Sequence, residues 1–511
     1  MTNTQSNKRI AKNTLFLYIR MLFVMGVTLF TSRIVLDKLG VQDYGIYNAV
    51  GGVVAMLSCL TGTLSTGTSR FLTFELGKND IVRLKHTFST AFYAHLVLAL
   101  IVALFMETIG LWFLYNKLII PEERLMAAVW TFHISVLTAM ISITQVPYTS
   151  VIIAHENMNV YAYLGIFEAA AKLLVVYFLV ISDGDRLVYY AILVAIVQVI
   201  IAMFYRFYCI KQYGESRVQR YLDKTILRNM LSYSGLSLVA NISQILSTQG
   251  LVVLINMFFQ PAVVAAQAVG NQISNAIMQF VSNLMTAINP QIIKLYAAGE
   301  YEASRKLTLQ SSVYIHELIL LFSLPAIVVM DTLLHIWLVE VPPYAVIFAQ
   351  YIILRQIFSV YNYTLYVPMM ASGKLGSNSW ANVWCGIGGI VILYIILKIG
   401  GDVMWVQYIS IVQAIIFSYI VKPYILCREI GYHWNEIFSS FFHCLKVSVF
   451  PVIVSVICSQ FIEVSDFIIM MIVVVVICIS VALSAYIFMN KETKAKLFEF
   501  IRGRFHFNKT E

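Results

Sequence analysis

The chain has 511 residues, of which 60% are hydrophobic and 12% charged, and its formal net charge is +9. Soluble chains carry roughly 25% charged residues, so this composition excludes a soluble globular protein, and the high hydrophobic fraction excludes a disordered chain. It also excludes a nucleic-acid-binding protein, because most basic residues stand between long apolar runs rather than along one solvated face. The composition predicts a polytopic membrane protein.

Apolar runs that are long enough to cross a bilayer recur along the whole chain. A spanning helix needs roughly 20 mainly apolar residues, and fourteen stretches meet this requirement. In chain order they are 14–34, 45–66, 88–113, 126–150, 158–182, 187–208, 230–257, 262–288, 308–331, 344–368, 377–398, 403–425, 438–460 and 466–489. Strands of a membrane barrel would instead alternate polar and apolar residues over roughly ten positions. The pattern therefore predicts an all-α membrane protein with about 14 transmembrane helices.

The distribution of lysine and arginine predicts the orientation of these helices. With the N-terminus in the cytoplasm, the inner loops and tails hold 25 of the 35 basic residues and the outer loops hold six. Cytoplasmic loops carry the excess of basic residues, so both termini are predicted to be cytoplasmic. The same residues lie next to the anionic lipids of the inner leaflet. Much of the net charge is thus a topology signal.

A weak internal repeat divides the chain into two lobes. The sequence NAVG at Asn48–Gly51 resembles QAVG at Gln267–Gly270, and a longer similarity follows the second and eighth spans. Two copies of six helices point the same way, as in transporters whose halves are related by a pseudo-two-fold axis along the membrane normal. We expect an N-lobe, a C-lobe, helices 13 and 14, and a basic cytoplasmic tail, with boundaries at 1–215, 216–430, 431–490 and 491–511.

Four cations lie more than one helical turn inside predicted spans, where a charge costs about 2.5–3.5 kcal/mol on insertion scales. Arg20 and Arg355 have no carboxylate within one helical turn. A guanidinium stays charged and binds phosphate through two hydrogen bonds, so these two arginines are the candidates for binding an anionic substrate. A purely structural role is the alternative. Lys446 is close enough to the inner surface to extend its ammonium there.

Lys172 is the fourth of these cations, and it follows Glu168 by four residues. This spacing places the two side chains on one helical face and predicts an ion pair. The pair is either structural or part of the site, with Lys172 at the substrate and Glu168 in ion coupling. Glu317 is a second candidate for coupling to H+ or Na+, with a buried structural hydrogen bond as its alternative.

Polar side chains recur at helical spacing on the seventh and eighth spans. Amides on two matched helices indicate a hydrated surface that binds sugar hydroxyls, although amides also hold membrane helices together. The candidate substrate-binding residues in these stripes are Asn241, Gln244, Thr248, Gln267, Asn271 and Asn275.

Sequence signatures of enzymes and metal sites are missing from the chain. It has no nucleotide-binding loop of the Walker type, no G-x-S-x-G and no H-E-x-x-H. The seven cysteines are scattered and form no C-x-x-C pair, so they predict neither a metal site nor a disulfide framework. We expect a protein that is not an enzyme, has no catalytic residue and needs no cofactor.

Two segments near the N-terminus carry a family resemblance. RIVLDKLGVQDYGIYNAVGG (Arg33–Gly52) and STGTSRFLTFELGKND (Ser65–Asp80) resemble bacterial polysaccharide-biosynthesis flippases of the Wzx kind. Their superfamily also holds MATE multidrug exporters and lipid II flippases. The resemblance implies two six-helix lobes plus two helices, and alternating-access export of an undecaprenyl-diphosphate-linked oligosaccharide across the bacterial inner membrane for O-antigen or capsule synthesis. Related lipid II flippases have a cavity arginine in the first span, and Arg20 is similar in place.

Three hypotheses follow, in order of preference. The first is the flippase, with polysaccharide polymerase and glycosyltransferases of the same pathway as possible partners. The second is a MATE-like, cation-coupled multidrug exporter. Its cavity would require acidic residues and no unpaired arginine. The third is a membrane-embedded polymerase or ligase, which the short outer loops disfavour.

Overall fold

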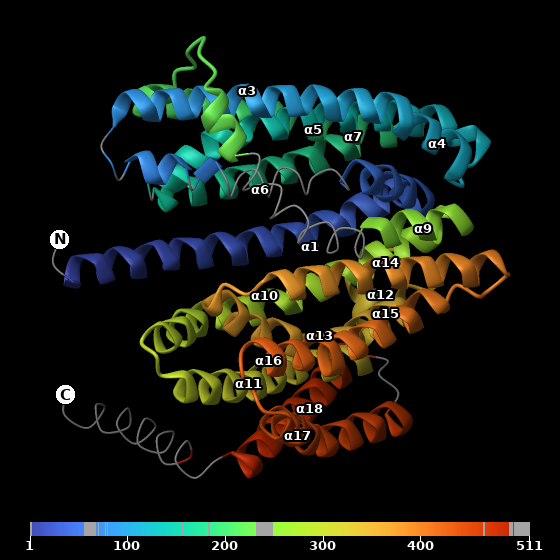
Figure 1. The fold of residues 1–511 in the computed structure, drawn as a ribbon. Helices are drawn as coiled ribbons and strands as arrows, with labels where there is room; N and C mark the ends of the chain where they lie inside the picture. Colours follow the sequence, from blue (N-terminus) through green and yellow to red (C-terminus); the bar gives the residue numbers. More distant parts are fainter. Residues whose placement is uncertain are drawn as a thin grey trace, which may run out of the picture. The chain divides into compact units, whose positions relative to one another are not determined.

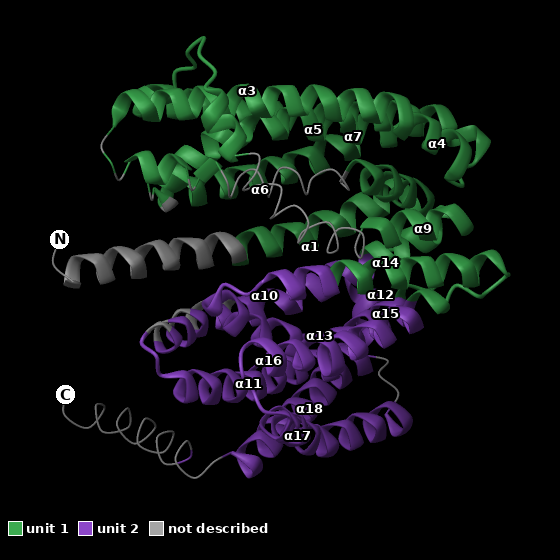
Figure 2. Ribbon diagram, in the orientation of Figure 1, with its two compact units in different colours: residues 1–268, 338–345, 382–406 green, residues 269–337, 346–381, 407–511 purple. Residues whose placement is uncertain are grey.

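The computed structural model describes residues 3–55, 68–69, 71–76, 78, 80–155, 157–181, 184–230, 249–462, 466–489 and 494. The side chains of residues 3–21, 55, 158, 283, 286, 287, 290, 294 and 297 are excepted. Every regular element in these residues is helical, which confirms the predicted fold class (Figure 1). The chain forms two compact units (Figure 2). Unit 1 comprises residues 1–268, 338–345 and 382–406, and unit 2 comprises 269–337, 346–381 and 407–511.

The helices of unit 1 come mainly from the first half of the chain. They are α1 (Asn3–Ala55), α3 (Ile81–Phe105), η1 (Met106–Gly110), α4 (Leu111–Lys117), η2 (Glu122–Arg124), α5 (Leu125–Ala154), α6 (Met158–Ile181), α7 (Arg186–Gln212), η3 (Gly214–Ser216) and α9 (Leu251–Phe258). Their core is apolar and includes the fully buried side chains of Ile46, Phe132 and Leu187.

The second half of the chain supplies most of unit 2. Its helices are α10 (Pro261–Ala297), α11 (Tyr301–Val328), α12 (Met330–Trp337), α13 (Ala345–Ser372), α14 (Gly376–Lys398), α15 (Trp405–Ile416), η5 (Phe417–Val421), α16 (Lys422–Glu429), α17 (Trp434–Phe461) and α18 (Phe467–Phe488). Four of these helices are shared with unit 1, which holds residues 261–268 of α10, Ala345 of α13, residues 382–398 of α14 and residues 405–406 of α15. Most of α14 therefore belongs to unit 1. Tyr361, Leu426 and Ile437 are buried in one core cluster of unit 2.

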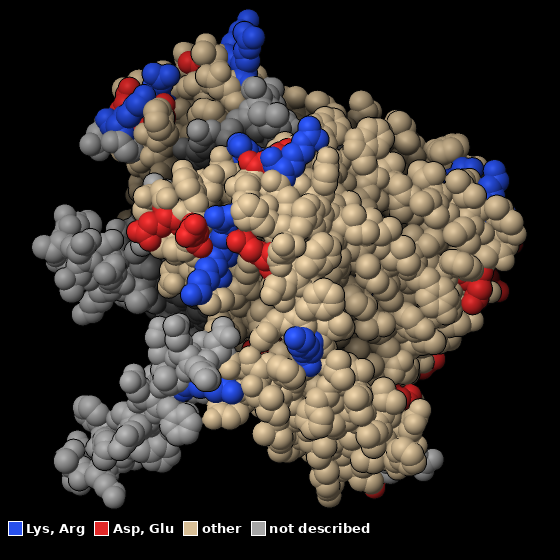
Figure 3. All heavy atoms as spheres, turned by 60° about the horizontal axis from the view of Figure 1, so that its bottom comes forward, with Lys and Arg blue, Asp and Glu red and all other residues tan. Residues whose placement is uncertain are grey.

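Nine helical segments of the described chain are long and apolar enough to cross a bilayer. They correspond to predicted spans three to six, nine, and eleven to fourteen. The first predicted span lies on α1, the eighth on α10 and the tenth on α13. The second and seventh spans lie partly on α1 and α9 and partly on residues outside the described part. The apolar exterior fits a lipid environment, since Ile468, Ile472 and Ile487 of α18 are more than half exposed. Most of the surface in Figure 3 is uncharged, and the charged side chains stand in small groups.

A bend in α1 separates the first two predicted spans. Gly40 has φ 77° and ψ 167°, which lie outside the helical region. Glycine adopts a positive φ readily because it has no Cβ. The chain therefore changes direction between the two apolar runs that the sequence predicts on either side of residues 35–44.

Arg124 links three segments of unit 1 through ion pairs. Arg124, next to the start of α5, donates to both carboxylate oxygens of Asp43 at 2.8 and 2.6 Å, and to both oxygens of Asp185 at 2.7 and 2.9 Å. Asp185 also caps α7 by accepting from the backbone N–H groups of Leu187 and Val188. Two bidentate pairs on one guanidinium fix the relative positions of α1, α5 and α7.

The pKa values of Asp43 and Asp185, the two partners of Arg124, are shifted in opposite directions. Burial is the largest influence on both, and it raises the pKa of Asp43 despite the hydrogen bonds from Arg124. Burial also opposes ionisation of Asp185, but the hydrogen bonds from Arg124 and from the α7 N-terminus outweigh it and lower the pKa of Asp185. The stability that Asp185 contributes is therefore present above the ordinary aspartate pKa and is lost as pH falls through its lowered value.

Replacing Arg124 with alanine should lower the free energy of unfolding by about 2 kcal/mol at pH 7, because it leaves two partly buried carboxylates without their donor. The loss should be smaller at pH 3, because Asp43, whose pKa is raised, is protonated there and no longer needs the positive charge of Arg124. Thermal unfolding of both proteins in detergent at the two pH values measures this difference. An equal loss at both would show that Arg124 acts through packing alone.

The small size of Gly45 allows α1 to pack closely against the start of α10 in unit 1. A Cβ built on Gly45 would overlap the backbone carbonyl of Pro261 at the start of α10. Since backbone cannot move aside like a flexible side chain, Gly45→Ala should destabilise the protein by about 1–3 kcal/mol. Gly388→Ala is the matched control, because nothing lies within 4 Å of a Cβ on Gly388. Equal melting temperatures for the two variants would contradict the close approach.

Candidate substrate site

Arg355 lies in α13 of unit 2 and is half-buried. Among the described residues no carboxylate pairs with its guanidinium, as the sequence predicts. Its face of α13 continues to Tyr363 and Met370, which are 45% and 43% exposed. The neighbouring face of the helix lines an apolar cavity of about 890 Å³ through Tyr351, Leu354 and Phe358. Arg355 is thus a charged donor on the less covered side of a helix that has no other charged residue.

The helix that carries Arg355 packs closely against α10. A Cβ on Gly270 would lie 2.6 Å from Ile352 Cδ1 and 3.2 Å from Ala349 Cα, so the small residues let the two helices approach each other. Gln356 Nε2 donates to Ser274 Oγ at 2.9 Å in the same interface. Small residues and interhelical hydrogen bonds are the usual means of packing membrane helices, and here they fix Arg355 beside α10.

The predicted amide stripe of the eighth span lies on α10. Gln267, Asn271 and Asn275 follow one another at four-residue intervals within a continuous helix, so they share one face. Gln267 is 1% exposed and belongs to unit 1. Asn271 is half-buried and Asn275 is exposed, and both belong to unit 2 with Arg355. Unit 2 therefore combines one free guanidinium with two amides on adjoining helices.

Several of the predicted site residues fall outside the described part. They are Asn241, Gln244, Thr248 and the side chain of Arg20, whose backbone lies in α1. Their roles stay predictions.

The predicted pair of Glu168 and Lys172 is confirmed. The Nζ of Lys172 donates to Oε1 of Glu168 at 2.8 Å, one turn apart on α6. The Lys172 side chain is 50% exposed. Both charges are neutralised by the contact, so Lys172 differs from Arg355, which keeps its charge free. Substrate binding by Lys172 and ion coupling by Glu168 stay predictions.

Sequence reasoning missed Lys422, which is 1% exposed in the first turn of α16. Its Nζ donates to Asn378 Oδ1 at 2.6 Å and lies 5.0 Å and 5.4 Å from the ring centres of Tyr366 and Phe417. In the described residues no carboxylate pairs with it. Lys422 lies three residues before the inner end of the twelfth predicted span (403–425), where basic residues are expected, and no local pattern distinguishes it. Phe417 of η5 is close to Lys422 in sequence, whereas Tyr366 of α13 and Asn378 of α14 lie 56 and 44 residues before it.

The buried contact between Asn378 and Lys422 yields a double-mutant test. Asn378→Leu should lower the free energy of unfolding by about 3 kcal/mol, because it leaves a buried ammonium without an acceptor. Adding Lys422→Met should recover most of that loss, since an apolar pair replaces the buried charge and its partner. Thermal melts of the two single variants and the double variant measure the coupling. Additive losses would rule it out.

Comparisons with known proteins bear on the fold. Neither a scan against family models nor a search of curated proteins gives a match. Among solved structures, the lipid II flippase MurJ in an inward closed conformation is similar at a TM-score of 0.68 and 10% identity, over 92% of this chain and 98% of that one. An inward-facing multidrug resistance MATE transporter of the MOP superfamily gives 0.62 at 13% identity, over 84% and 98%.

A further similar structure is that of a MATE protein in a straight conformation, with a TM-score of 0.59 at 12% identity, over 82% of this chain and 95% of that one. The chain has the fold of these transporters. They are transporters and flippases rather than enzymes, and at such low identity the likeness establishes the polytopic membrane fold alone. The choice of substrate must be argued from the site.

Proposed function

We propose that this chain is a flippase of the superfamily that includes MATE transporters and MurJ, and that it moves an undecaprenyl-diphosphate-linked oligosaccharide from the cytoplasmic to the outer leaflet by alternating access. The free guanidinium of Arg355 carries the proposal. A diphosphate requires a fixed cation, and an unpaired arginine in a membrane span supplies one with bidentate geometry.

The surroundings of Arg355 suit the rest of such a substrate. Asn271 and Asn275 offer amide donors and acceptors of the kind that bind sugar hydroxyls. The apolar exterior of the helices lets a polyprenyl chain remain in lipid while the head group crosses. The likeness to a lipid II flippase over 92% of the chain supports the same class of cargo, a sugar carried on a lipid diphosphate.

The proposal extends to location and partners. We place the protein in the bacterial inner membrane with both termini cytoplasmic, on the strength of the lysine and arginine distribution. Polysaccharide polymerase and glycosyltransferases that make surface polysaccharide are the partners that a flippase of this kind requires. Anionic inner-leaflet lipids contact the basic inner loops and tail.

A MATE-like exporter of cationic drugs is the second candidate. The similarity to MATE structures supports it, and so does Glu317, a carboxylate that lines a cavity of about 600 Å³ in unit 2. A positive guanidinium repels cationic drugs, however, so Arg355 favours the flippase. Drug susceptibility of a deletion strain distinguishes the two, because only the exporter predicts increased sensitivity.

Replacing Arg355 with alanine should reduce surface glycan at least about tenfold, the effect of losing charged hydrogen bonds worth about 1.5–3 kcal/mol. Arg20→Ala should do the same, whereas Arg355→Lys should retain part of the function. Lys446→Ala is the matched control, because Lys446 is an exposed cation on α17. Glycan is measured on gels at equal protein level by immunoblot. Wild-type glycan in both arginine variants would refute the anion-binding role.

A further inference from the structure

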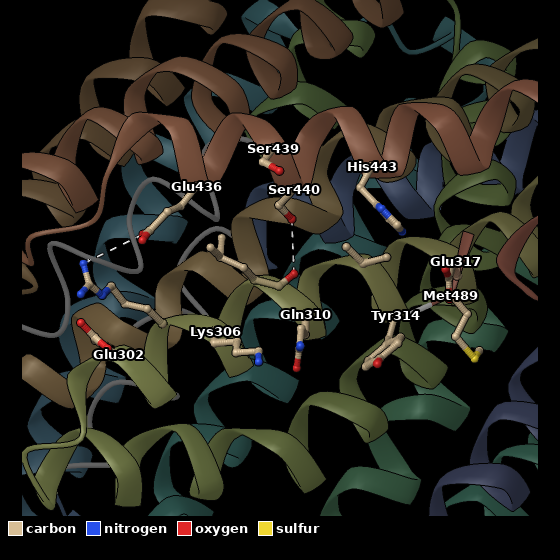
Figure 4. A pocket seen from close by; sticks show the side chains of 13 residues that line it. Glu302, Lys306, Gln310, Tyr314, Glu317, Glu436, Ser439, Ser440, His443 and Met489 are labelled. Carbon is tan, nitrogen blue, oxygen red and sulfur yellow. Dashed lines mark hydrogen bonds and ion pairs between the residues drawn. The ribbon is translucent and has the colours of Figure 1, made fainter. Parts of the chain in front are cut away.

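A polar groove lies between α11 and α17, two helices that are long and apolar enough to cross a membrane. Its volume is about 600 Å³, and all of its lining residues belong to unit 2 (Figure 4). The lining side chains are Glu302, Arg305, Lys306, Leu309, Gln310, Val313, Tyr314, Glu317, Glu436, Ser439, Ser440, His443 and Met489.

The polar lining follows one face of each helix. On α11, the polar residues from Glu302 through Lys306, Gln310 and Tyr314 to Glu317 recur every three or four positions. Glu436, Ser440 and His443 do the same on α17. Polar faces within a membrane helix pair are tolerated where they line a hydrated cavity. The groove is thus suited to water rather than to acyl chains.

Hydrogen bonds between the helices give the depth of the groove. Ser440 Oγ donates to the Leu309 carbonyl at 3.3 Å, in the part of the groove nearer its rim. At the deep end, next to Glu317, His316 Nε2 forms a hydrogen bond with Ser448 Oγ at 2.8 Å. Ser484 Oγ donates to the Val447 carbonyl, which sets α18 against the same level. Glu317 therefore lies about 6 Å inside the end of α18 at Phe488, at roughly 1.5 Å per residue.

The length of α18 gives the depth of Glu317 relative to the hydrocarbon core of the bilayer. Its 22 residues span about 33 Å, close to the thickness of the hydrocarbon core. Glu317 accordingly lies just within the hydrocarbon. The rim residue Glu302 precedes it by fifteen positions, about 22 Å along α11, and so lies in the aqueous or head-group layer. The groove connects these two levels.

Two of the charged residues at the rim, Arg305 and Glu436, lie close to each other. Arg305 Nη1 donates to the Gly431 carbonyl at 2.8 Å and lies 4.0 Å from Glu436 Oε2. Glu317 has no ion pair or hydrogen bond with any residue of the described part. A carboxylate at this depth requires a proton or a cation to neutralise it.

We propose that the groove between α11 and α17 is an access route for protons, and that Glu317 is the group that binds and releases them. This inference rests on the proposed transport function and names its coupling ion. His443, on the opposite wall, is the relay: its imidazolium N–H bond breaks as an O–H bond forms on the Glu317 carboxylate, and solvent in the groove reprotonates the ring. No oxidant or reductant takes part.

The other titratable groups around Glu317 are consistent with a proton site. From α11 these are Glu302, Arg305, Lys306, Tyr314 and His316, and from α17 they are Glu436, His443 and Cys444. In the described chain no three His, Cys, Asp or Glu side chains gather closely enough to hold a metal ion. A single carboxylate beside Val313 and Met489 lacks the several oxygen ligands that a sodium ion needs, and a proton needs only one.

Access to the groove is tested by cysteine labelling of the full chain in liposomes. Tyr314→Cys, within the groove, should react with a charged, membrane-impermeant thiol reagent at least tenfold faster than Leu445→Cys. Leu445 is the matched control, because it lies within one residue of the depth of Tyr314 but is 60% exposed on a face of α17 that does not line the groove. Peptide mass spectrometry separates both from the native cysteines. Equal rates would overturn the hydrated route.

Proton binding is tested by infrared titration of the full chain in lipid nanodiscs. The wild type should show a protonated-carboxyl C=O band that Glu317→Gln removes, that Glu317→Asp shifts and that Glu436→Gln leaves in place. His443→Gln should slow the exchange of that proton with deuterium at least tenfold. A band unchanged in Glu317→Gln would overturn the proposal, and a band abolished by sodium at constant pH would replace the proton with a sodium ion. None of these measurements involves a substrate, so their failure leaves the flippase proposal intact.

Discussion

The cost of a charge in a low-dielectric bilayer is the constraint on which this structure depends. The described part of the chain meets it in several ways. Arg124 lies between two carboxylates near the ends of helices, Lys172 is neutralised by Glu168 one turn away, and Lys422 is enclosed by two aromatic rings and an amide. Arg355 shares none of these arrangements. A cation that the fold keeps free despite its cost is the clearest reason to assign it a ligand, and a diphosphate has the matching charge and geometry.

Close approach between helices is the second determinant, because it decides what those charges can reach. Gly45 meets the backbone of Pro261, and Gly270 meets Ala349 and Ile352. Without hydrophobic driving force between helices in lipid, such contacts supply packing that larger side chains would prevent. In unit 2 this packing sets α13 against α10, and with it Arg355 against the helix that carries Asn271 and Asn275. The same unit holds the groove that ends at Glu317.

A fold shared with both a lipid II flippase and multidrug transporters does not choose between their cargoes. The two classes differ in the charge that their site must neutralise. The free cation of α13 suits an anionic head group, while the carboxylate at the end of the α11–α17 groove suits a proton. Separate positions for an anion and a proton within one unit are compatible with transport that is driven by an ion gradient.

The sequence by itself determined the fold class, the positions of most spans and the pair of Glu168 and Lys172, because each follows from composition or from spacing along one helix. It also identified Arg355, since a cation without a carboxylate one turn away is visible in the sequence. Only the tertiary structure decided that Lys422 is buried, that Arg124 bridges two aspartates, and that Glu317 ends a groove walled by α17. The hydrogen bonds between helices that decide these features join residues 44 to 132 positions apart, and no helical periodicity relates them. Burial and pairing between helices depend on how the helices pack, which the local pattern of residues does not specify.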